Sequence, residues 1–264
     1  MKRARVAYLG AVHDAVEEEG RLRLADGRTV DESAVVWLPP LATTTRPRTI
    51  FAVEINYTDH GKDLDFKSPD EPLVSVKGPG SLVGHRGETR RPADATYMHY
   101  ACELAVVIGK TARRVTRTDA YEYVQGYTVA NDYMVRDYLE DYYAPGLRAS
   151  GRDACTPLGP WLVDAADIRD PMNLRLRTTI NGGITQQGNT RDMVFDIRFL
   201  IAYLSAFMTL FAGDVILTGT PDGLVGVHEG DEVVTEIDGI GRLSNTVVGE
   251  SSIAQGAGAA RRPA

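Results

Sequence analysis

The sequence has few cysteines, no long apolar run and no excess of positive charge. Its two cysteines, Cys102 and Cys155, give neither a disulfide framework nor the spacing of a metal-binding cluster, and we expect them to pack as small apolar groups. No stretch approaches the roughly 18 consecutive apolar residues that a membrane span needs. The first residues also lack the apolar core of a signal peptide. We therefore expect a cytoplasmic protein that does not act in a membrane.

Charge and composition indicate an ordinary globular protein. The net charge is −7, and the basic residues are scattered without interleaved aromatics, which argues against nucleic acid as a partner. Hydrophobic residues make up 43% of the chain and charged residues 25%, a balance that is typical of a packed domain. A chain of 264 residues is long enough to bury a sizeable core.

Short apolar runs separated by Gly, Pro and Asp-Gly turns predict many strands and few helices. Residues 104–109 have the length of a buried strand, and only residues 195–210 show a clear amphipathic helix pattern. This pattern predicts a β-dominated α+β fold. We expect a small N-terminal β unit at 1–45, a catalytic domain at 46–250 and a disordered tail at 251–264.

One cluster of reactive side chains lies at 56–63. His60 and Asp63 are three residues apart, so on a helical turn they would share a face. An imidazole beside a carboxylate can act as a general base with its orienting acid. The alternative is the exposed start of a surface helix, and this cluster alone does not decide between the two.

Two further carboxylates and one turn are candidate site elements. Glu103 and Asp132 each lie at the edge of a strand-like run, from which they can point into a shared cavity and hold a hard cation. Most such carboxylates are simply solvated. Residues 217–223 run from a strand into a Gly/Pro turn that carries Thr220, and the backbone N–H groups of such a turn can bind a substrate carboxylate. A plain turn is the alternative.

Taken in order, these motifs make residues 50–248 similar to the fumarylacetoacetate hydrolase family. With Met-His-Tyr at 98–100 and Phe-Met-Thr-Leu at 207–210, the chain most resembles one subgroup, the bacterial decarboxylase/isomerase of homoprotocatechuate breakdown (2-hydroxyhepta-2,4-diene-1,7-dioate isomerase and 5-oxopent-3-ene-1,2,5-tricarboxylate decarboxylase). The stretches that carry the resemblance are Asn-Tyr-Thr-Asp-His at 56–60, Lys-Gly-Pro at 77–79, Glu-Leu-Ala-Val-Val-Ile-Gly-Lys at 103–110, Gly-Tyr-Thr-Val-Ala-Asn-Asp at 126–132, Gln-Gln-Gly-Asn-Thr at 186–190 and Leu-Thr-Gly-Thr-Pro at 217–221.

The resemblance implies a homodimeric enzyme of mixed β-roll or sandwich fold. It implies Mg²⁺ or Mn²⁺ as cofactor and a small anionic 2-oxo acid as substrate, with the metal acting as a Lewis acid in isomerisation, decarboxylation or C–C hydrolysis. By the same resemblance His60 is the base, Asp63 its partner, and Glu103 and Asp132 are metal ligands. The residues that it places at the substrate are Lys77, Arg136, Arg152, Gln186 and Thr220.

Three positions depart from the family pattern, and all lie in or near the expected site. Ala101 stands where the family has the first carboxylate of a Glu-x-Glu metal motif. Ser150 stands in place of a lysine, and Glu54 in place of a glycine. Losing a carboxylate weakens the binding of a hard cation, so the metal is expected to be weakly bound or absent. Divergence, repurposing, loss of activity or engineering would each leave such changes.

Three functions therefore stay open at this point. The first is a metal-assisted lyase, isomerase or hydrolase of a 2-oxo (enol) dicarboxylic acid in aromatic catabolism. The second is metal-independent chemistry with Glu54 and His60 as acid and base, and the third is a non-catalytic binding relative. Three roles stay open for Glu54: it could replace the metal ligand lost at Ala101, act as a general acid or base, or face solvent.

Overall fold

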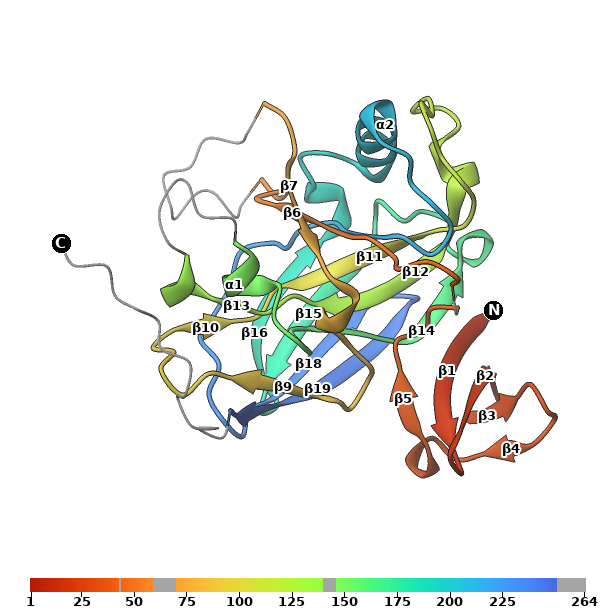
Figure 1. Cartoon of the computed structure of the whole chain (residues 1–264), viewed down its shortest axis with the longest axis vertical. Helices are drawn as coiled ribbons and strands as arrows, with labels where there is room; N and C mark the ends of the chain where they lie inside the picture. Colours follow the sequence, from red (N-terminus) through yellow and green to blue (C-terminus); the bar gives the residue numbers. More distant parts are fainter. Residues whose placement is uncertain (43, 59–69, 140–145, 251–264) are drawn as a thin grey trace.

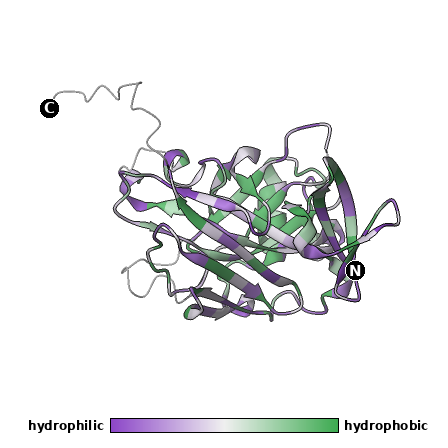
Figure 2. Cartoon of the chain, turned by 90° about the horizontal axis from the view of Figure 1, so that it is seen from below, coloured by the Kyte–Doolittle hydropathy of each residue, from purple (hydrophilic) through white to green (hydrophobic). Residues whose placement is uncertain are grey.

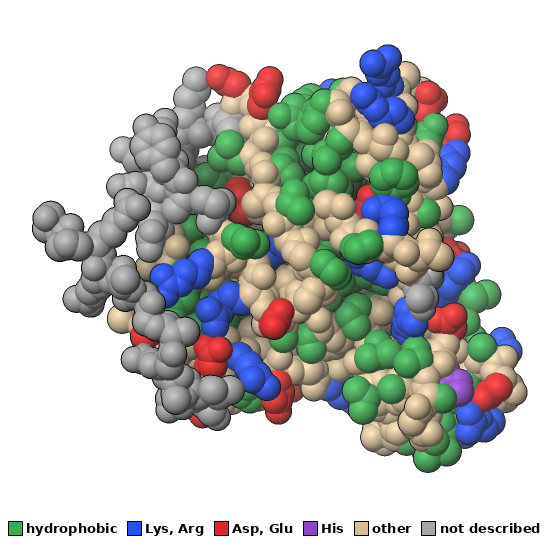
Figure 3. All heavy atoms as spheres, viewed as in Figure 1, with side chains coloured by type: hydrophobic (Ala, Val, Ile, Leu, Met, Phe, Trp, Pro, Cys, Tyr) green, Lys and Arg blue, Asp and Glu red, His purple; other side chains and the backbone are tan. Residues whose placement is uncertain are grey.

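The computed structural model describes residues 1–42, 44–58, 70–139 and 146–250. Strands of three sheets are the main regular elements, with few helices, which confirms the predicted β-dominated α+β fold (Figure 1). The predicted tail at 251–264 lies outside the described residues. No helix in the described ranges is long and apolar enough to span a membrane. Acidic and basic side chains are interspersed on the face that Figure 3 shows.

A twelve-stranded sheet forms the largest part of the fold. Ten strands follow the order β4-β3-β2-β1-β14-β12-β11-β17-β6-β7, while β5 pairs with β1 and β8 with β14. The bounds are β1 (Lys2–Tyr8), β2 (Ala11–Glu18), β3 (Arg21–Leu24), β4 (Thr29–Val30), β5 (Val36–Leu38), β6 (Ile50–Glu54), β7 (Leu73–Lys77), β8 (Leu82–Val83), β11 (Cys102–Ile108), β12 (Val124–Asn131), β14 (Thr156–Asp164) and β17 (Val215–Leu217).

Two smaller sheets and two α-helices complete the described elements. The five-stranded sheet has the order β16-β15-β18-β19-β9, and β10 pairs with β13. The bounds are β9 (Glu88–Arg91), β10 (Met98–His99), β13 (Met134–Val135), β15 (Arg175–Ile180), β16 (Gly183–Asn189), β18 (Glu232–Ile237), β19 (Gly241–Gly249), α1 (Leu147–Ser150) and α2 (Ile197–Phe207).

The predicted amphipathic helix is α2, but it is shorter than the pattern at 195–210. It begins at Ile197 because the Asp196 carboxylate accepts a hydrogen bond of 2.6 Å from the Phe199 N–H, which satisfies a donor of the first turn. It ends at Phe207, after which Met208 is extended. The prediction was therefore right for the helix and wrong by two to three residues at its ends.

The N-terminal strands extend the large sheet. Strands β1 to β4 are antiparallel neighbours, and the Asp-Gly turn at 25–28 closes the hairpin between β3 and β4, with Gly27 at a φ of 90°. Strand β1 also pairs with β14, so this unit continues the sheet while forming a lobe at one end of the molecule (Figure 1). The domain boundary at 45 stays a prediction.

The part of the sheet from β14 to β7 curls into a roll. Four strands separate β14 from β7 in the order of the sheet. Nevertheless the Lys77 ammonium at the end of β7 donates to the Thr156 hydroxyl on β14 over 3.1 Å. Strand β8, which follows β7 in the chain, pairs with β14 at the same residue. The two edges therefore face each other across the inside of the roll.

The two faces of the roll have different cores. The inner face carries small and aliphatic side chains from every second position, namely Ile50, Ala52, Ala105, Ala130, Leu158 and Leu217. The outer face packs against α2 and the five-stranded sheet, and hydrophobic residues gather on these central strands (Figure 2). A buried polar link joins the layers, because Asn131 donates to Asn245 over 3.0 Å.

Strand β11 is buried along its whole length, and its apolar side chains should contribute strongly to stability. Leu104 is 0% exposed, so Leu104→Ala should lower the free energy of unfolding by roughly 2–5 kcal/mol, since it leaves a cavity in the outer-face core. The matched control is Leu73→Ala on the edge strand β7, where the side chain is 49% exposed and the expected loss is below about 1 kcal/mol. Urea unfolding of both variants measures the difference. Equal losses would contradict this assignment of the core.

Candidate active site

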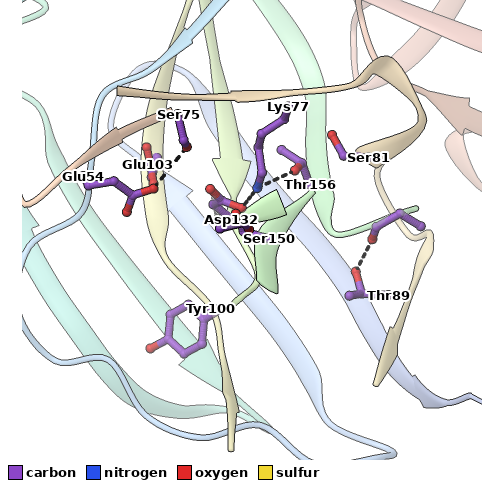
Figure 4. A network of polar contacts seen from close by, with 12 residues as sticks. Glu54, Ser75, Lys77, Ser81, Thr89, Tyr100, Glu103, Asp132, Ser150 and Thr156 are labelled. Carbon is purple, nitrogen blue, oxygen red and sulfur yellow. Dashed lines mark hydrogen bonds and ion pairs between the residues drawn. The ribbon is translucent and has the colours of Figure 1, made fainter. Parts of the chain in front are cut away.

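Strand register places Glu54, Ser75 and Lys77 on the inner face of the roll. In the antiparallel pair of β6 and β7, Ala52 lies opposite Ser75 and Ile50 opposite Lys77. Side chains two residues apart on a strand share a face, and directly opposed residues do too. Glu54 therefore projects to the same side as Ser75 and Lys77, next to the inner core (Figure 4).

Glu103 and Asp132 reach the same face from the neighbouring strands. Glu103 lies opposite Ala130 in the pair of β11 and β12, and Ala130 belongs to the inner core. Asp132 lies two residues beyond Ala130, and its N–H donates to the carbonyl of Ala101 over 2.8 Å. The two predicted metal ligands thus lie at one site, where Glu103 is 4% exposed and Asp132 is 6% exposed.

A buried ion pair links the two edges of the roll. The Lys77 ammonium forms a hydrogen-bonded ion pair with the Asp132 carboxylate and donates to Thr156 over 3.1 Å. Lys77 is 2% exposed. Burial lowers the pKa of Lys77 to about 8, against the opposing fields of Cys155, Glu103 and Glu54. At neutral pH the group is still a cation.

Glu103 is held by the turn that follows β17. Its carboxylate accepts a hydrogen bond of 2.7 Å from the N–H of Gly219, whose φ of 84° suits a glycine. Burial raises the pKa of Glu103 to about 8, and the nearby Glu54 adds to the rise, while the Gly219 N–H and Lys77 oppose it.

Glu54 lies on the inner face of the roll and is partly buried. Its carboxylate accepts a hydrogen bond of 3.3 Å from the Ser75 hydroxyl (Figure 4). Burial raises the pKa of Glu54, with Lys77, Ser75 and Arg136 opposing the rise. A partly buried carboxyl that favours its neutral form, beside a lysine cation, has the properties of a proton donor and acceptor.

Gln186 and Thr220 contact each other at the rim of the Glu103 turn. The Gln186 amide donates to the Thr220 hydroxyl over 2.8 Å and to the Pro221 carbonyl over 2.7 Å. Its Oε1 atom is buried and has no hydrogen-bond partner among the described residues. A buried acceptor without a donor is unfavourable, so a ligand hydroxyl would satisfy it.

The two predicted substrate arginines have protein partners. Arg136 donates to the His99 imidazole over 3.0 Å and lies close enough to lower the pKa of Glu54. Arg152 forms an ion pair of 2.7 Å with Glu250, and its guanidinium lies 5.7 Å from the ring centroid of Tyr138. Substrate binding by Arg152 would compete with this ion pair, and its role stays a prediction.

His60 and Asp63 lie outside the described residues, so their predicted roles stay untested. The described start of their segment is anchored beside the site. Asn56 donates to the carbonyl of Thr218 over 2.8 Å and accepts from the N–H of Phe195 over 2.8 Å. The chain therefore enters the segment of His60 next to the turn that holds Glu103.

Sequence reasoning missed Ser75 and Thr156, which position Glu54 and Lys77. Ser75 had a signal, because it lies two residues before Lys77 in a strand pattern and so shares its face. Thr156 had none, since it lies 79 positions from Lys77 in the chain and only the curl of the sheet brings them together. Ser150, predicted to replace a lysine, is buried near Asp132 (Figure 4).

The donor set does not fit a divalent ion with three carboxylate ligands. The described residues contain no group of three or more His, Cys, Asp or Glu side chains arranged to hold a metal. Asp132 forms an ion pair with Lys77, and Glu103 accepts a hydrogen bond from the Gly219 N–H. At position 101 the alanine side chain is a methyl group, which cannot bind a metal. Hard cations need several free oxygen ligands, so a weakened site is what these contacts support.

Sequence comparison gives the family. The fumarylacetoacetate (FAA) hydrolase C-terminal family model matches residues 49–248. The chain belongs to the fumarylacetoacetate hydrolase family. Within this family it is 55% identical over 213 residues to a 4-hydroxyphenylacetate degradation bifunctional isomerase/decarboxylase of Salmonella dublin, a match that covers 81% of this chain and 49% of that protein. The chain spans about half the length of the curated relatives of this name.

Solved structures of the family share the fold. The crystal structure of 5-carboxymethyl-2-hydroxymuconate delta-isomerase from Mycobacterium smegmatis superposes with a TM-score of 0.84 at 35% identity, covering 95% of this chain and 99% of that one. Maleylpyruvate hydrolase from Sphingobium, in complex with manganese(II) and pyruvate, superposes with a TM-score of 0.79 at 27% identity. This match covers 94% of this chain and 99% of that one. A divalent metal is therefore present in at least one relative.

The raised pKa of Glu103 predicts a pH-dependent stability. In the folded protein the pKa of Glu103 lies above its ordinary value of 4.5. The contribution of Glu103 to stability is therefore complete below pH 4.5 and is lost as the pH rises toward 8. Glu103→Gln keeps an acceptor for Gly219 and removes the titration. Between about pH 5 and about pH 9 the Tm of both proteins should fall. The fall should be about 2–4 °C smaller in the variant than in the wild type.

Thermal unfolding monitored by circular dichroism measures this difference. The control is Glu88→Gln, which changes an exposed carboxylate of β9 and should follow the wild type at both pH values. A Glu103→Gln variant with the same pH dependence as the wild type would show that Glu103 is not a buried titrating group.

Proposed function

We propose that this protein is an isomerase that moves a proton within a small 2-hydroxy (enol) or 2-oxo dicarboxylic acid of aromatic catabolism. The observation that carries the proposal is the group of the partly buried Glu54 and the buried Glu103 and Lys77 on the inner face of the roll. The isomerase activities named for the Salmonella and Mycobacterium relatives support the reaction class.

Such an isomerisation needs an acid and a base but no redox partner. One proton leaves the enol oxygen, one C–H bond forms, and the double bond shifts between them. Glu54, whose pKa is raised by burial, can give its proton to the carbon and then take the hydroxyl proton as a carboxylate. His60, outside the described residues, is the proposed second acid or base.

The chain offers binding groups for both polar ends of such a substrate. Lys77 supplies a buried cation for a carboxylate or a developing enolate. Gln186 supplies the unfilled acceptor Oε1, which matches a substrate hydroxyl. Arg136, beside Glu54, is the proposed contact for the second carboxylate.

Decarboxylation and C–C hydrolysis, the other predicted reactions, release an electron pair that needs a sink. A divalent ion holding the 2-oxo acid would be that sink. The described carboxylates do not form a three-ligand site for it. The contacts therefore favour the isomerase function over the two cleavage reactions.

A spectrophotometric assay tests the proposed function. 5-Carboxymethyl-2-hydroxymuconate should lose its conjugated enol absorbance in the presence of the enzyme, and maleylpyruvate should not be hydrolysed. Isomerisation with no cleavage is the expected result. Hydrolysis of maleylpyruvate without any isomerisation would overturn the proposal.

Glu54→Gln should lower kcat for isomerisation by about a hundredfold or more, because an amide neither gives nor takes the proton. Ser75→Ala, which removes only the hydrogen bond to Glu54, should cost less than about tenfold. Glu88→Gln is the control for an exposed carboxylate and should leave kcat unchanged. Unchanged kcat in Glu54→Gln would remove Glu54 from the mechanism.

We also propose that the protein is a homodimer. The family resemblance is the main support, and a weaker one is α2, where Phe207 is 60% exposed and packs edge-on against Tyr203, which stacks on Phe199. Light scattering should then give twice the chain mass of 28.8 kDa. A monomer across a wide concentration range would contradict the proposal.

A further inference from the structure

The inner face of the roll contains a cation of its own. Lys77 is 2% exposed and contacts the Asp132 carboxylate, while Thr156 accepts a second hydrogen bond. A lysine ammonium has three N–H donors. The described residues give the third donor no acceptor, and Glu54 and Glu103 lie near enough to act on Lys77 electrostatically.

The carboxylates are arranged around this cation. Asp132 reaches it from the end of β12 and Glu103 from β11, while Glu54 lies beside Glu103 under Ser75 (Figure 4). A hard divalent ion would need Asp132 and Glu103 as ligands, and both already have protein donors. A metal bound by Asp132 would therefore compete with the Lys77 cation for the same carboxylate.

The charges of the site leave Lys77 as its described cation. Ala101 removes one carboxylate from the expected metal motif, and Asp132 is paired with Lys77. Burial raises the pKa of Glu103 to about 8 and so favours its neutral form. A neutral carboxyl is a poor ligand for a hard cation, whereas the Lys77 ammonium is already in place.

We propose that the Lys77 ammonium is the resident cation of this site and binds the 2-oxo acid directly, in place of a divalent metal. Its free N–H donates to the substrate carboxylate or to the oxygen that becomes the enolate, and Asp132 and Thr156 hold it in position. The inference rests on the proposed function for its substrate, but its tests measure binding and not turnover.

Electron paramagnetic resonance with Mn²⁺ tests the cation directly. The wild type should bind Mn²⁺ weakly, and Lys77→Met should bind it at least about tenfold more tightly, because Asp132 is released. Lys77→Arg keeps the charge and should behave as the wild type. Adding Asp132→Asn to Lys77→Met should abolish the gain. Tight Mn²⁺ binding by the wild type that Lys77→Met weakens would overturn the proposal.

Oxalate binding is the second measurement, and its deciding comparison, the wild type with and without Mn²⁺, does not involve a variant. Oxalate resembles the planar 2-oxo acid end of the substrate. Calorimetry with chelator present should show wild-type and Lys77→Arg binding, with at least about a tenfold loss in Lys77→Met. Oxalate binding by the wild type only after Mn²⁺ is added would overturn the proposal. Absence of isomerase activity would leave both results unaffected and would refute only the proposed function.

Discussion

The ion pair between Lys77 and Asp132 joins β7 to the end of β12, across the three strands that lie between them in the sheet. It can form only because the sheet curls until its edges face each other. A buried ion pair has a desolvation cost, and breaking one partner of such a pair is strongly unfavourable. The same contact closes the roll and fixes the charge at the centre of the site.

Side-chain alternation then decides which residues share this interior. Glu54, Ser75, Lys77, Glu103 and Asp132 come from four segments, and the strand pairings turn each of them toward the inside. The residues between them, such as Leu104 and Val53, turn outward into the large core. A register shift of one residue in any of these strands would turn its polar site residue outward and place an apolar neighbour inside the roll.

The altered residues are consistent with one another in this geometry. Ala101 removes a carboxylate, Glu54 adds one near Glu103, and Lys77 remains as a buried cation. Together they leave a site rich in proton donors and acceptors with raised or lowered pKa values. These side chains are better suited to transferring a proton than to stabilising the electron pair that C–C cleavage leaves on carbon. For this reason we favour the isomerase function.

The sequence by itself determined the strand content, the helix at α2, the family and the candidates Glu103, Asp132, Gln186 and Thr220, because local patterns and short motifs carry that information. It could not show that Lys77 lies on Asp132 or that Thr156 holds it, since these contacts join residues 55 and 79 positions apart. Nor could it choose among solvent, ligand and acid for Glu54, because a strand side chain has two faces. Only the curl of the sheet, which depends on the packing of both cores, decided that Glu54 faces the cation.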